Sequence, residues 1–248
     1  MTYRACTALL MITGSLFAFT VNATPLTVSS SIGGAPTESG IFYENFDSLP
    51  IGTYGTPTNT VAYNLSNGLS VDFNGGMVFQ GSQSGVAAAP YLSGNNSDNF
   101  ENIASTGQDN SPYLVAGAGG SQNTITFNFS QGQMYLGLLW GSVDHDNTLS
   151  FYDSNNNLIG TVTGSAVLTS ANGNQGINGT TYVNISSNIA FNKVVASSTS
   201  PSFELDNMAF KASTTVPEPT ILGLFGLGLL LMGVAPFNQR NAISSMIA

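Results

Sequence analysis

The sequence contains little charge and almost no cysteine or histidine, and each shortage excludes a class of function. Charged residues make up 7% of the 248 residues, against about 25% in a typical globular protein. The only cysteine is Cys6 and the only histidine is His145. Residues 24–215 therefore cannot contain a disulfide, a thiolate metal site, a cysteine nucleophile or a zinc site built on several histidines.

Positive charge is especially scarce. Between residues 24 and 215 there are two lysines, Lys193 and Lys211, against twelve Asp and Glu. Nucleic-acid binding needs clustered Lys and Arg to neutralise phosphates, so we expect no nucleic-acid partner. Apolar and aromatic residues are too frequent for a disordered chain. Asn, Ser, Thr and Gly replace the missing charges, a composition common in extracellular β-proteins.

Residues 1–23 have the features of an export signal. Arg4 precedes an apolar run over residues 8–19, and the segment closes on Val21-Asn22-Ala23, which suits a signal peptidase. The run is shorter than the roughly 20 residues that span a bilayer. The sequence predicts a signal peptide cleaved after Ala23, with a membrane anchor or an ordinary core helix as alternatives.

The other end of the chain carries a more specific pattern. Val216, Pro217, Glu218 and Pro219 are followed by the uncharged residues 220–235 and then by Arg240. The prolines cannot continue a strand ladder, so we expect the folded domain to end at residue 215. The glycines of the uncharged stretch are tolerated better in a membrane helix than in a soluble one, which predicts one transmembrane helix.

This C-terminal arrangement, paired with a signal peptide, resembles the PEP-CTERM sorting signal of exosortase substrates over residues 216–240. The resemblance implies a Gram-negative host, a transient stay in the inner membrane and cleavage by an exosortase. It further implies release to the cell surface or the extracellular polysaccharide matrix. Family members usually end in several Arg or Lys, whereas here Arg240 stands alone before the tail of residues 241–248. A simple C-terminal membrane anchor is the alternative.

Residues 24–215 show short alternating segments and no sustained helical period. Turn dipeptides such as Asn67-Gly68 and Asn74-Gly75 separate the segments. We predict an all-β fold, an antiparallel two-sheet sandwich like a jelly roll, with residues 82–108 as a surface loop. The candidate strands are residues 41–46, 61–65, 69–73, 77–80, 113–115, 124–129, 134–139, 148–152, 158–162, 181–185, 193–196 and 203–210.

This body also resembles the jelly-roll surface domains found among exosortase-dependent proteins. The segments responsible are residues 43–50, 138–144, 147–153 and 203–210. The resemblance implies a surface domain and leaves the ligand open.

Two pairs of carboxylates lie on the first and last predicted strands. In jelly-roll carbohydrate-binding modules these strands are often neighbours, so the resemblance implies that Glu44, Asp47, Glu204 and Asp206 share one structural calcium, an ion that takes six to eight oxygens. The alternative is that they are solvated at strand ends. Glu204 and Asp206 also resemble part of the catalytic strand of laminarinase-like glycosidases, but the second glutamate needed for retaining hydrolysis is absent.

A second cluster, Asp144, His145 and Asp146, lies between two predicted strands. It can bind a metal or a ligand, or supply a general base, but no nucleophile elbow accompanies it. A solvated loop is the alternative. Trp140, just before it, is a candidate sugar-stacking platform, or else a core residue at the end of an apolar strand.

The sequence therefore predicts a non-enzymatic exported protein of the cell surface or extracellular matrix that binds exopolysaccharide. Its processing partners would be signal peptidase and an exosortase. The alternative is a secreted carbohydrate-active hydrolase that uses Glu204, Asp206 or the pair Asp144 and Asp146.

Overall fold

The computed structural model describes residues 25–56, 58–97, 107–117, 123–200 and 202–213. The predicted signal peptide (1–23), sorting segment (216–240) and tail (241–248) lie outside these residues. The chain divides into two compact units after Ala212, where the last strand ends. Within the described residues, no helix is long and apolar enough to cross a membrane.

The described residues form an all-β fold with antiparallel pairing between the strands, as predicted. Eleven strands belong to one large sheet, and two short strands, β6 and β7, form a second. Four short helical turns interrupt the strands. The elements are β1 (Leu26–Ser31), β2 (Phe42–Glu44), β3 (Val61–Asn64), η1 (Ser66–Gly68), β4 (Leu69–Asn74), β5 (Met77–Gln80), β6 (Tyr91–Leu92), η2 (Gly94–Ser97), β7 (Gly107–Gln108), β8 (Pro112–Ala116), β9 (Thr124–Gly141), β10 (Asn147–Tyr152), β11 (Leu158–Thr163), α1 (Gly164–Val167), η3 (Ile177–Gly179), β12 (Thr181–Ser198) and β13 (Phe203–Ala212).

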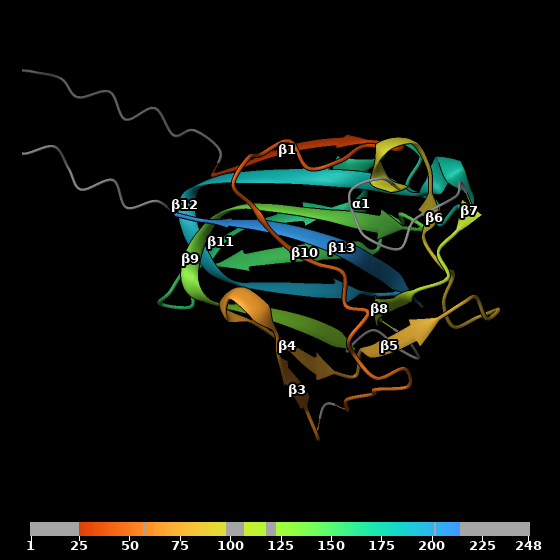
Figure 1. The fold of residues 1–248 in the computed structure, drawn as a ribbon, viewed down its shortest axis with the longest axis horizontal. Coiled ribbons are helices and arrows are strands. Elements are labelled where there is room, and N and C mark those ends of the chain that lie inside the picture. Colours follow the sequence, from red (N-terminus) through yellow and green to blue (C-terminus); the bar gives the residue numbers. More distant parts are fainter. Residues whose placement is uncertain (1–24, 57, 98–106, 118–122, 201, 214–248) are drawn as a thin grey trace, which may run out of the picture. The chain divides into compact units, whose positions relative to one another are not determined.

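Two long strands join what the sequence predicts as separate sheets. β9 and β12 each run for 18 residues, and they pair with each other along both of their ends (Figure 1). The first part of β9 also pairs with β4, and its last part pairs with β13. We call the first region the β4 half; it also contains β3, β10 and β11. We call the second region the β13 half; it also contains β1, β2, β5 and β8.

Irregular pairing in the long strands keeps apolar side chains facing the core in both halves of the sheet. β9 buries Phe127 before its irregularity and Leu136 after it, so the inward positions change from odd to even numbers. β13 changes in the same way between Leu205 and Met208, where Asn207 has a φ of +48°. An extra residue in one strand shifts the alternation by one position. The shift allows one bent strand to contribute to the core at both ends.

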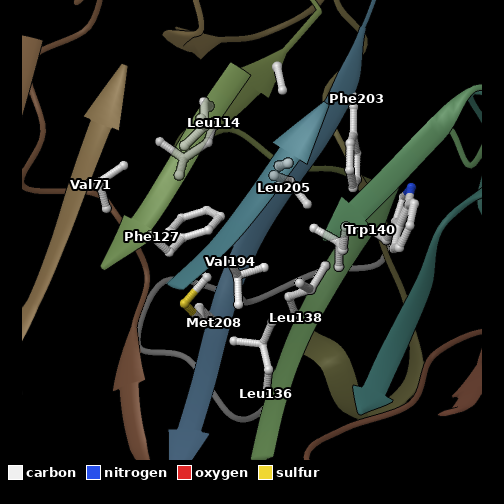
Figure 2. Packing of buried hydrophobic residues seen from close by; sticks show 14 of the residues in the cluster. Val71, Leu114, Phe127, Leu136, Leu138, Trp140, Val194, Phe203, Leu205 and Met208 are labelled. Atoms are coloured by element: carbon white, nitrogen blue, oxygen red, sulfur yellow. The ribbon is translucent and has the colours of Figure 1, made fainter. Parts of the chain in front are cut away.

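The core lies between the two halves and contains side chains from both. Figure 2 shows Phe127 and Val194 of the β4 half near Met208 of the β13 half. Trp140 lies at one end of this cluster, where its ring stacks on Phe203 with the centroids 4.3 Å apart. Aromatic side chains therefore occupy much of the interior.

The other side of the β13 half is covered by part of the segment that the sequence predicts as a surface loop. Ala87, Ala88 and Ala89 are buried, and Leu92 packs against Leu139 and Tyr182. The prediction of a surface loop is therefore wrong for this part of residues 82–108. Small side chains allow the backbone to lie close to the sheet, and the N–H groups of Ala88 and Tyr91 donate to Glu204 on β13 and to Thr180 just before β12.

Candidate functional site

Glu204 and Asp206 project from β13 on the side opposite the core. Alternate residues of a strand face opposite sides, so these carboxylates point away from the core residues Phe203 and Leu205. They are 0% and 1% exposed; the segment around Ala88 lies over Glu204, and Asp109 lies against Asp206. Two acids are thus enclosed between the sheet and its covering segment.

Glu204 is held by two donors. The backbone N–H of Ala88 donates to Oε1 at 3.0 Å, and the hydroxyl of Ser142 donates to Oε2. Gly141 makes room here, since a Cβ at that position would lie 3.1 Å from both Glu204 and Pro90. Burial raises the pKa of Glu204, and the bonds from Ser142 and Ala88 only partly oppose that effect.

Asp206 faces a carboxylate that comes from a distant part of the chain. Its Oδ1 accepts the N–H of Asn207 at 2.7 Å, and Asp109 lies within hydrogen-bonding reach of its side chain. Asp109 is 4% exposed, and its Oδ1 accepts both the N–H and the hydroxyl of Ser111. Burial raises the pKa of Asp206 well above its usual range, and the charges of Asp109 and then Asp47 raise it further.

The remaining oxygens of this pair have no donor. Oδ2 of Asp109 and Oδ2 of Asp206 are both buried and accept no hydrogen bond from the described residues. The two described lysines are engaged elsewhere: Lys193 lies over the ring of Tyr152, and Lys211 pairs with Glu38 at 2.9 Å. Burying a charge without a partner is costly. The Asp109–Asp206 pair therefore requires a proton or a cation.

The structure does not gather the four carboxylates of the predicted calcium site into one group. Glu44 accepts the N–H of Phe46 and lies beside the side chain of Ser66. Glu204 instead accepts hydrogen bonds from Ser142 and Ala88. None of the four acids belongs to a group of three potential metal ligands, among the described residues, whose ligand atoms lie within 4.8 Å of one another. The neighbouring positions of β2 and β13 do place Asp47 near Asp206, as the resemblance implies. Asp109, which the sequence analysis did not identify, is the closer partner.

The Asp144–His145–Asp146 cluster lies at the surface between β9 and β10. His145 Nδ1 is 2.6 Å from Asp144 Oδ1, and its Nε2 is 3.5 Å from Asp146 Oδ1. Both carboxylate oxygens of Asp146 also accept hydroxyls, from Thr199 and Ser200, and these bonds lower its pKa. The three residues are close enough to bind one metal ion. However, the imidazole faces a carboxylate at each nitrogen, so neither nitrogen is directed at a hydroxyl of the described residues.

Trp140 cannot act as a sugar-stacking platform, because it is 0% exposed. One face of the ring is stacked on Phe203, and its indole N–H donates to Asn147 Oδ1 at 3.2 Å. The alternative that Trp140 belongs to the core is confirmed.

Asn147 is a second residue that the sequence analysis did not identify. It also accepts the N–H of Asp144 and donates to Ser198 at 3.1 Å. It thereby ties the acidic loop to Trp140 and β12. In the sequence, only its position next to Asp146 indicates that Asn147 belongs to this cluster.

No family model matches this chain, and the search of curated proteins gives no match. The geometry and the sequence pattern must therefore support any functional assignment.

Proposed function

We propose that this protein is a non-enzymatic component of the cell surface or extracellular matrix, delivered there by an exosortase. Its jelly-roll-like sandwich binds exopolysaccharide. The sorting part rests on Val216–Pro219, the uncharged residues 220–235 and Arg240, together with the export signal of residues 1–23.

The burial of Glu204 and Asp206 is the observation that most supports a binding role. A general acid or base must come within about 3 Å of the atom it protonates or deprotonates. Glu204 is covered by the segment around Ala88 and Asp206 is equally buried beside Asp109, so a polymer cannot reach either carboxylate without displacing part of the chain. The hydrolase alternative thus loses the pair on β13 and depends on Asp144 and Asp146.

Exposed aromatic rings are the best candidates for sugar contacts, because Trp140 is buried in the core. Tyr43 on β2 and Tyr54 after it are 44% and 47% exposed. A flat ring with a polar tip suits the C–H face and hydroxyls of a sugar. With so few charges on the chain, such binding depends little on salt.

The test is to incubate the full-length protein, purified in mild detergent, with the exopolysaccharide of its host. We expect weak retention that is insensitive to salt and no steady release of reducing ends. Tyr43→Ala and Tyr54→Ala should each lower the affinity by roughly twofold to tenfold, as expected for about 0.5–1.5 kcal/mol per aromatic contact.

A matched control is Leu158→Ala, which removes an apolar side chain that is 56% exposed on β11. It should leave retention unchanged. Steady release of reducing ends that Asp144→Asn or Asp146→Asn abolishes would establish the hydrolase instead.

A further inference from the structure

The Asp109–Asp206 pair differs from an ordinary acidic patch because it is enclosed. Both residues are at least nine-tenths buried, and each has one carboxylate oxygen that accepts no hydrogen bond from the described residues. Every other oxygen of the pair is satisfied by Ser111 or Asn207. The two side chains lie within hydrogen-bonding reach of each other, and each keeps one buried oxygen available to a cation.

We propose that Asp109 and Asp206 together bind one calcium ion between β13 and its covering segment. This inference does not depend on the proposed function.

The chemistry of the donors selects the class of ion. Both ligands are carboxylates, and His145, the only histidine of the chain, lies against Asp144 instead. Hard oxygen donors suit calcium or magnesium rather than zinc or copper. Magnesium gives up its water reluctantly and is seldom held in an enclosed protein cage, whereas calcium accepts backbone carbonyls and carboxylates in flexible geometry.

Among the residues that the structure describes, the surroundings add negative potential and no competing cation. Asp47 lies close enough to act on Asp206, and the buried Tyr113 feels the charges of Glu204, Asp109 and Asp206. The hydroxyl of Tyr113 donates away from the pair, to Gly81 O at 2.6 Å. A divalent cation would neutralise both carboxylates of the pair, whereas a single shared proton would leave one negative charge.

The bound ion would also connect two distant parts of the chain. Asp109 follows β7, and its N–H donates to Pro90 O at 2.8 Å, so it belongs to the covering segment. Asp206 belongs to β13. An ion between them would fasten that segment over the sheet.

The experiment uses the full-length protein, stripped with EGTA and then titrated with calcium. We expect one bound calcium per chain by atomic absorption and a rise in Tm of roughly 5–10 °C at about a hundred times Kd. Asp109→Asn and Asp206→Asn should each abolish both the bound calcium and the Tm response. The circular dichroism of each variant shows whether it has folded. One folded variant of the two is enough to test the site.

The control variants are Asp144→Asn and Asp146→Asn, which alter the surface cluster and should retain calcium binding. Two outcomes would overturn the proposal. In the first, the wild-type protein shows neither bound calcium nor a Tm response, which would mean that the pair shares a proton. In the second, calcium is lost in the Asp144 or Asp146 variant and retained in the Asp109 and Asp206 variants.

Discussion

Glu204 shows how a single buried acid makes the stability of this protein depend on pH. Its pKa in the folded state is raised by burial above the ordinary value of 4.5. The folded state therefore holds a proton over a pH range in which the unfolded state has lost it. The free energy of unfolding must fall as the pH rises from 4.5 to the raised pKa.

Glu204→Gln should remove this contribution. We expect the unfolding free energy of the variant to vary less with pH above 4.5. The difference from wild type should change by about 1.4 kcal/mol for each pH unit between the two pKa values. Urea unfolding in EGTA from pH 4 to 8 measures it. Glu38→Gln, at the partly exposed pair with Lys211, is the control and should follow the wild-type curve. Parallel curves for Glu204→Gln and wild type would contradict the assignment.

At the scale of elements, the irregularity in β13 positions the carboxylates relative to the core. Asn207 has a φ of +48°, and its backbone both donates to Asp206 and accepts the hydroxyl of Tyr182 at 3.2 Å. Asn tolerates this left-handed conformation, whereas a β-branched residue does not. Without the irregularity, Met208 could not face the core while Asp206 faces away from it.

Asn207→Val should therefore destabilise the protein by roughly 1–2 kcal/mol, the cost of a left-handed conformation in a residue with a branched Cβ. Asn207→Gly keeps both backbone hydrogen bonds and should cost less. Chemical denaturation of the two variants provides the comparison. Equal losses of stability would show that the side chain, and not the backbone conformation, is what matters at this position.

The alternating segments of the sequence predict most of the strands but not their continuity. The hairpin of β10 and β11 lies where the pattern predicts it, at residues 148–152 and 158–162. β9 and β12 are each predicted as two strands, because the polar residues 130–133 of β9 and 186–188 of β12 interrupt the alternation. β1 is not predicted, since Leu26–Ser31 alternates only weakly and ends in serines.

The candidate site could be predicted only in part, for a related reason. Glu204 and Asp206 are visible as acids two residues apart on a strand. Asp109 lies in a stretch with no periodicity, and only the pairing of β6 with β7 and the bond to Pro90 bring it to the sheet. The burial of Trp140 depends on Phe203 and Asn147, which no pattern near Trp140 reveals.

At the scale of the whole molecule, the proposed sorting can be checked by mass. We expect protein isolated from the extracellular matrix to lack residues 1–23 and the residues after about Pro219. Intact-mass spectrometry measures both ends at once. A Pro217→Ala, Pro219→Ala double variant should stay in the membrane fraction. A matrix protein that still contains residues 221–235 would leave the plain membrane anchor as the explanation.

The shared strands have a consequence for how the β domain comes apart. β9 and β12 run through both halves of the sheet, so neither half has a boundary at which it could open while the other stays closed. Cooperative units of this kind expose their backbone only by global unfolding. Proteases act on chains that have opened locally. In the extracellular setting that we propose, where no chaperone refolds a damaged chain and the single cysteine allows no internal disulfide, unfolding as one unit would itself protect the protein from proteolysis.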